Sequence, residues 1–281
     1  MTCSFQRLIL SPNVVLNYSC KFLLFGFCGY LFLGSSQAVS GDFLKFKEAL
    51  DALKAPPPRP SVSMVASGFG ASKGDVFAAV SYSDQDLQTN VGGDEDGSII
   101  LGFGYEVENS PFKAEFSFGI TSVSTSWWGD GKFADEGNVN LKLHKAITPI
   151  SMGSAASLSF GASNITGWGG TREIPTNKYI SYSEVIGFGT FDQYSAAYTV
   201  GYGTSVGKGE TSGELFGGIA LARSLLSTSI SFIGDEFYLS GTYYPAALKY
   251  MAVTYTRGDA FNNHNSSRNI LTIGISKRFN S

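Results

Sequence analysis

His264 and Ser266 are residue types that a nucleophilic hydrolase uses, and they stand two positions apart. A histidine activates a serine hydroxyl as a general base when the two groups come within hydrogen-bonding reach. Spacing of two residues aligns side chains only in an extended strand, and this pair lies in an Asn- and Ser-rich stretch. No orienting third residue can be identified, because Asn262, Asn263 and Asn269 are merely nearby. We therefore expect no catalytic residues and keep hydrolysis as an alternative.

A second set of candidate residues consists of charged or ionisable side chains that alternate with apolar ones. The set is Lys113, Glu115, Lys142, His144 and Glu214. Facing an enclosed aqueous space, such groups would select passing solutes by charge. The alternative is that they pair with one another and brace the structure around them.

An acidic stretch carries the oxygen ligands that Ca²⁺ prefers. Its carboxylates are Asp84, Asp86, Asp94, Glu95 and Asp96. Thr89, however, occupies the position at which an EF-hand loop needs glycine for its sharp turn. We expect a solvated loop and no metal. The chain has only 2 histidines and 3 cysteines, so no transition-metal cluster and no cofactor are expected.

The composition restricts the class of protein. Charged residues make up 15% of the 281 residues, against roughly 25% in ordinary soluble domains, while hydrophobic residues make up 43% and aromatic residues 14%. A disordered chain would combine low hydrophobicity with high charge, so disorder is excluded. The net charge of −3 disfavours a nucleic-acid partner, because phosphate binding needs a basic surface.

Residues 1–38 have the order of a secretory signal peptide. Arg7 and Lys21 precede an apolar stretch over residues 22–34, and small residues lead to a cleavage site after Ala38. The apolar stretch is shorter than the roughly 20 residues of a spanning helix. A membrane anchor is the alternative. Phe43, Phe46 and Leu50 then indicate a short amphipathic helix, and prolines indicate a stiff spacer, within residues 39–60.

From residue 74 onward the apolar residues recur with period two. Over residues 112–121, for example, Phe116 and Phe118 alternate with Glu115 and Ser117, the pattern of a strand with one apolar face. The predicted strands are 75–83, 98–107, 112–121, 138–145, 155–163, 179–187, 193–202, 213–222, 226–232, 236–244, 247–256 and 270–279. The apolar residues expected to face a membrane are Ile99, Leu101, Phe103, Phe116, Phe118, Leu141, Leu143, Tyr198, Ile273, Ile275 and Phe279.

The connections between these segments alternate between long and short, apart from the very short one over 233–235. A membrane barrel has short turns at one end and long loops at the other, whereas a soluble sandwich has no reason for such an order. We therefore predict an all-β fold, a closed antiparallel barrel of about twelve strands (ten to fourteen) over residues 61–281. Residues 61–70 either add a strand or lie inside the barrel.

The signal segment through Ala38, the alternating strands and the end of the chain together resemble a bacterial outer-membrane β-barrel. Many such proteins end in an alternating strand closed by Phe, which the barrel-insertion machinery reads. Leu271, Ile273, Ile275 and Phe279 match that pattern, although Lys277 interrupts it and two residues follow Phe279. The resemblance implies export to the outer membrane and three partners: the lipid bilayer, the insertion machinery and, in a channel, a small hydrophilic solute. A homo-oligomer is also compatible with it.

A barrel of this size should leave a narrow interior, since eight strands leave a filled one and sixteen leave an aqueous channel. Small residues on the polar faces, such as Ser159, Thr199 and Ser229, would leave room for water or solute. The leading hypothesis is therefore a porin-like channel for small hydrophilic solutes or ions. The alternatives are an adhesin- or receptor-type barrel with a blocked interior and a lipid hydrolase. The His264-Asn265-Ser266 spacing resembles that of outer-membrane phospholipase A, but Ser267 and Arg268 depart from its pattern.

Overall fold

The computed structural model describes residues 60–84, 96–121, 134–188, 194–205, 213–248, 250–261 and 267–279. All of them belong to one unit, Asp42–Ser281. None of the helices in these ranges is long and apolar enough to cross a membrane. The signal peptide expected over residues 1–38 lies outside the described residues, and so does nearly all of the helix and spacer expected over 39–60.

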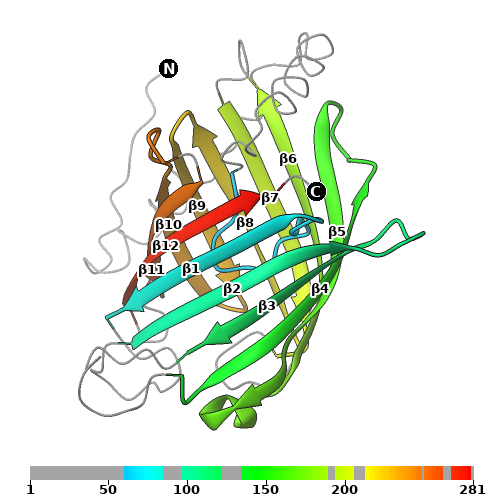
Figure 1. The fold of residues 1–281 in the computed structure, drawn as a ribbon. Coiled ribbons are helices and arrows are strands. Elements are labelled where there is room, and N and C mark those ends of the chain that lie inside the picture. Colours follow the sequence, from blue (N-terminus) through cyan, green and yellow to red (C-terminus); the bar gives the residue numbers. More distant parts are fainter. Residues whose placement is uncertain are drawn as a thin grey trace, which may run out of the picture. The chain divides into compact units, whose positions relative to one another are not determined.

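Twelve antiparallel strands form a closed barrel, as the alternating pattern predicts (Figure 1). The strands are β1 (Asp75–Ser83), β2 (Asp96–Glu106), β3 (Lys113–Ile120), β4 (Gly137–Ile147), β5 (Ser154–Trp168), β6 (Asn177–Phe188), β7 (Tyr194–Gly203), β8 (Glu214–Arg223), β9 (Leu226–Ile233), β10 (Glu236–Tyr243), β11 (Met251–Gly258) and β12 (Arg268–Arg278). A short 3₁₀ helix, η1 (Gly169–Glu173), follows β5. Every strand pairs with its neighbours in sequence, and β1 pairs with β12.

The β1–β12 pairing closes the barrel and is tied at both ends. At one end the Arg278 guanidinium donates to both carboxylate oxygens of Asp75, over 2.6 and 2.8 Å. At the other end the Asn269 amide N–H donates to the Asp84 carboxylate over 2.7 Å. Between them nine residues of β1 are in register with β12, from Asp75 opposite Arg278 to Ser83 opposite Ile270. Closure leaves no open sheet edge, as a wall in contact with lipid requires.

The two ends of the barrel differ in their connections. The turn end carries the start of β1, the end of β12 and the connections 107–112, 148–153, 189–193, 224–225 and 244–250. The loop end carries the connections 84–95, 121–136, 169–176, 204–213, 234–235 and 259–267. Each connection at the loop end is longer than any connection at the turn end, except 234–235. This is the same connection that breaks the alternation in the sequence.

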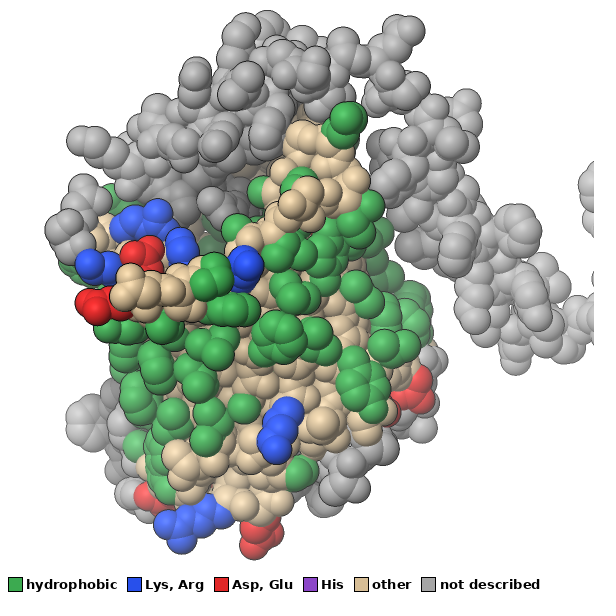
Figure 2. Space-filling view, turned by 90° about the vertical axis from the view of Figure 1, so that its right-hand side faces the viewer, with side chains coloured by type: hydrophobic (Ala, Val, Ile, Leu, Met, Phe, Trp, Pro, Cys, Tyr) green, Lys and Arg blue, Asp and Glu red, His purple; other side chains and the backbone are tan. Residues whose placement is uncertain are grey.

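The strand alternation places apolar side chains outward. All eleven residues expected to face a membrane lie on this outer face, from Ile99 on β2 to Ile275 on β12 and Phe279 just after it. Figure 2 shows hydrophobic side chains over most of the middle of one face, with the acidic side chains in view near its margins. The inner face carries mainly Ser, Thr, Gly and Ala.

The predicted strand 247–256 begins too early. Strand β11 starts at Met251, because residues 244–248 form a connection in which the Leu248 N–H donates to the Pro245 carbonyl. Its register settles the choice between two apolar series, since Val253 stands opposite the outward Ile273 and Tyr255 opposite Leu271.

Replacing Ile273 by Arg should destabilise the barrel, because it places a charge on the outer face in the middle of β12. A cationic side chain at the bilayer midplane costs about 2–4 kcal/mol. The matched control is Gly274→Arg, one residue along on the inner face, which should leave the free energy of unfolding nearly unchanged. Denaturant unfolding in lipid vesicles measures both. Equal losses would contradict the assignment of the two faces.

Candidate functional site: the barrel interior

Residues 60–74, which we call the luminal segment, run along the inside of the barrel wall before β1 begins (Figure 1). Their contacts pass from strand to strand. Near its start, the Ser63 N–H donates to the Ser229 hydroxyl over 3.4 Å, and the Ser231 hydroxyl donates to the Ser63 carbonyl over 2.7 Å. At its end, Lys73 forms an isolated bridge with Gly104 of β2. The segment is therefore inside the barrel rather than a thirteenth strand.

The first half of the luminal segment is held by a small apolar cluster. Val62 is buried against Ala197 of β7 and Ala220 of β8, with Val65 and Val185 packed alongside. Ser61 also hydrogen-bonds the Tyr244 side chain in the connection after β10, where burial raises the pKa of the phenol. Two alanines on the inner wall leave the room that the Val62 side chain fills.

The middle of the luminal segment lies directly on the wall. The Gly68 N–H donates to the Ser183 hydroxyl over 2.8 Å, and the Ser159 hydroxyl donates to the Ser67 carbonyl over 3.2 Å. A Cβ at Gly68 would lie 2.2 Å from the Ser157 carbonyl oxygen, so only glycine permits this approach. The small inner residues that the sequence suggested as room for solute are thus covered here by the chain itself.

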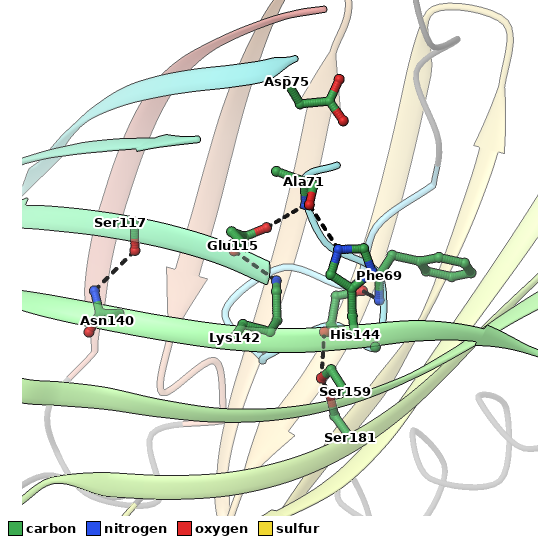
Figure 3. Close-up of polar contacts among 12 residues, drawn as sticks. Phe69, Ala71, Asp75, Glu115, Ser117, Asn140, Lys142, His144, Ser159 and Ser181 are labelled. Atoms are coloured by element: carbon green, nitrogen blue, oxygen red, sulfur yellow. Dashed lines mark hydrogen bonds and ion pairs between the residues drawn. The ribbon is translucent and has the colours of Figure 1, made fainter. Parts of the chain in front are cut away.

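Four of the five predicted interior residues meet around Ala71 and Ser72, and Figure 3 shows three of them, Glu115, Lys142 and His144. Glu115 accepts the Ala71 N–H over 2.6 Å and pairs with Lys142 over 2.9 Å. His144 Nε2 lies 2.8 Å from the Ala71 carbonyl and must carry the proton, because a carbonyl only accepts. Lys113 donates to the Ser72 hydroxyl over 3.1 Å. These side chains pair with one another and with the segment, which corresponds to the bracing alternative.

Glu214 does not join this group. It is the first residue of β8, at the loop end, whereas Ala71 lies near the turn end. A Cβ at Gly234 would lie 2.4 Å from a Glu214 carboxylate oxygen, so this side chain lies against the β9–β10 connection. The five predicted interior residues therefore lie at two separate places in the barrel.

A buried cluster near the loop end was not predicted. Arg268 Nη1 lies 2.7 Å from a Glu236 carboxylate oxygen, and Nη2 donates to the Tyr238 hydroxyl over 3.0 Å. The arginine side chain crosses Gly258, where a Cβ would lie 3.0 Å from Arg268 Cγ. The sequence carries one signal that could have found this cluster. Arg268 stands four residues before the inward Thr272, so strand alternation places its charge on the inner face.

The inner wall is covered unevenly. Under the luminal segment, Ser159, Ser181 and Ser183 are 0%, 1% and 2% exposed. On the opposite wall, formed by β11, β12 and β1, the inner side chains from the turn end to the middle of the barrel are half-buried or exposed: Phe77, Ala79, Ser81, Ala252, Thr254, Thr272, Gly274 and Ser276. Toward the loop end the inner side chains of the same strands are buried: Ser83, Thr256, Arg268 and Ile270. Among the described residues, a Cβ at Gly274 would meet nothing closer than 3.8 Å. This strip is the accessible part of the interior.

Other sequence candidates lie outside the described residues. His264 and Ser266 are among them, as are Asp86, Asp94, Glu95 and the side chain of Asp96. Asp84 is described and hydrogen-bonds Asn269 at the barrel closure. Within the described ranges no group of three His, Cys, Asp or Glu residues could hold a metal ion.

No protein-family model matches the chain, and no curated protein matches it. Similar solved structures include the KdgM porin in complex with disordered oligogalacturonate, at 7% identity and a TM-score of 0.46, covering 73% of this chain and 99% of that one. An outer membrane channel from Pseudomonas putida F1 has 10% identity and a TM-score of 0.41, covering 75% and 97%. Omp33 of Acinetobacter baumannii has 8% identity and a TM-score of 0.38, covering 73% and 97%.

The luminal segment should loosen when its carboxylate partner is removed. In Glu115→Ala the Ala71 amide loses its acceptor, and a hydrogen bond to a charged group contributes about 1.5–3 kcal/mol. Hydrogen exchange of that amide should accelerate about 10- to 100-fold. Ser117→Ala is the control, because the Ser117 hydroxyl accepts from Asn140 on the wall. Unchanged exchange in Glu115→Ala would contradict the proposed anchoring.

Proposed function

We propose that this protein is an outer-membrane channel of the porin type, which lets small hydrophilic solutes or ions pass through a narrowed barrel. The observation that carries the proposal is the uneven cover of the inner wall. A closed barrel with an apolar outside is suited to a bilayer, and the accessible strip on β11, β12 and β1 offers a path along its inside from the turn end to the middle of the barrel.

The passage runs between this strip and the luminal segment. Its described wall carries mainly hydroxyl groups and small side chains, with Thr254, Thr272 and Ser276 pointing inward and Phe77 of β1 as an aromatic exception. Hydroxyls replace part of the hydration of a polar solute without binding a single charge strongly. The path therefore favours small polar solutes and selects chiefly by width.

The charged residues have a supporting role in this proposal. Glu115 and Lys142 neutralise each other beside the luminal segment, so they hold its position rather than create a field across the passage. Near the loop end, Arg268 and Glu236 are likewise paired. Selectivity between anions and cations should accordingly be weak in the described part of the passage.

A bulky side chain on the accessible strip should narrow the passage. Gly274→Trp adds an indole where a Cβ meets nothing closer than 3.8 Å, so the barrel should fold and its single-channel conductance should fall roughly twofold or more. Gly241→Trp is the matched control, since a Cβ there meets nothing within 4 Å and Gly241 stands opposite the outward Tyr255. Planar-bilayer recordings measure both. Wild-type conductance in the Gly274→Trp variant would refute the location of the passage.

Displacing the luminal segment should widen the passage. In Gly68→Val the valine Cβ would collide with the Ser157 carbonyl oxygen, so the luminal segment should leave the wall. The single-channel conductance should then rise. If the barrel folds and wild type conducts, the variant should conduct with a larger and less uniform amplitude, and a smaller amplitude would contradict the widening. If wild type is silent and Gly68→Val conducts, the protein is the blocked barrel and the channel proposal is wrong.

A further inference from the structure

Glu184 is an acidic residue on the outer face of the barrel, yet it is 0% exposed. On β6 it stands in register with Ala156 of β5 and Tyr198 of β7, and the strand alternation directs all three outward. Ile186 and Phe188 follow it on the same face, nearer the turn end. The carboxylate therefore lies within the apolar band rather than beyond its margin.

Five donors surround this carboxylate. Oε1 accepts the Ser151 N–H over 2.8 Å and the Ser154 hydroxyl over 2.5 Å. Oε2 accepts the Ile150 N–H over 3.1 Å, the Tyr198 hydroxyl over 2.8 Å and the Tyr182 hydroxyl. Every partner donates, which is the set that an ionised carboxylate accepts. A charge removed from water must be compensated in this way.

The donors tie one particular segment to the wall. Two of them are backbone N–H groups of the β4–β5 connection, residues 148–153, and Ser154 follows directly. The connection is thereby held against the outside of β6. It contains Pro149, which has no N–H and fixes its own φ, so few alternative conformations compete.

The tethered connection presents two apolar side chains outward. Ile150 is 79% exposed and Met152 is 96% exposed, more than any other large hydrophobic side chain among the described residues. An apolar patch that continues a lipid-facing wall is expected to contact lipid as well. The donors of this connection thus compensate the buried Glu184 charge, and the same bonds hold two apolar side chains away from the barrel.

We propose that Glu184 is a positioning residue that holds the β4–β5 connection as a membrane anchor, with Ile150 and Met152 inserted among the acyl chains of the bilayer. The inference rests on the proposed membrane location. The occupant follows from continuity, because apolar Ile186 and Phe188 flank the same stretch of wall on the side of the turn end. Glu184 acts through the connection and itself touches no lipid.

The test places a nitroxide label at Met152→Cys in the full chain, with Cys3, Cys20 and Cys28 replaced by Ser. The protein is folded into vesicles of phosphatidylcholine and phosphatidylglycerol. Collisions with oxygen, which partitions into lipid, and with a water-soluble nickel chelate then report the surroundings of the label. A label at Ile273→Cys serves as the reference for the apolar band. We expect both labels to favour oxygen.

Adding Glu184→Ala or the shape-preserving Glu184→Gln should release the connection and raise the nickel accessibility at residue 152 severalfold, with residue 273 unchanged. Glu108→Gln, an exposed carboxylate in the connection 107–112, is the control and should change neither label. The unchanged reference label shows that the Glu184 variants have folded.

Each contrary outcome contradicts a different statement. If the label at residue 152 favours the nickel chelate while the label at residue 273 favours oxygen, the membrane anchor is wrong and the membrane location stands. If both labels favour the nickel chelate, the membrane location is wrong. Lipid at residue 152 in both Glu184 variants overturns the positioning role. Spin–spin broadening between labels at residue 152 means that a second copy covers the site, which overturns the lipid assignment.

Discussion

The pairing of β1 with β12 is the constraint on which the remaining structure depends. A sheet that meets lipid cannot leave backbone N–H and C=O groups unpaired, and closure satisfies them without an edge. Once the ring is closed, strand alternation divides every residue between two environments. Apolar residues such as Phe118 and Ile273 then face outward, and the hydroxyls of Ser159 and Thr272 face inward.

One carboxylate on each face of the wall follows the same electrostatic rule. Glu184 faces outward but is enclosed by five donors. Inside, Glu115 is satisfied by Lys142 and by the Ala71 amide. In both cases a carboxylate binds a segment that is not part of the sheet. This segment is the β4–β5 connection on the outside and the luminal segment on the inside. Burying each charge is costly unless it is paired in this way.

The strand set could be predicted because a one-sided apolar pattern persists in every strand. The register of β11 was ambiguous because residues 247–256 contain two competing apolar series, and only pairing with β12 decides between them. The Glu115–Lys142 pair follows from neighbouring strands, as the sequence suggested. The contact of Glu115 with Ala71 could not be predicted, because its partner is a backbone amide in a segment without periodicity. Glu184 carried a signal, an acid on an apolar face, but its donors come from segments that no spacing rule brings together.

Cysteine scanning along β12, from residue 271 to 276 in an otherwise cysteine-free chain folded into vesicles, would show which surroundings each face has. The account predicts a strict period of two: residues 272, 274 and 276 react with a small water-soluble maleimide, and residues 271, 273 and 275 react only with a lipid-soluble one. Reaction of both sets with the water-soluble reagent, or the reverse order, would contradict a wall that separates lipid from an enclosed aqueous space.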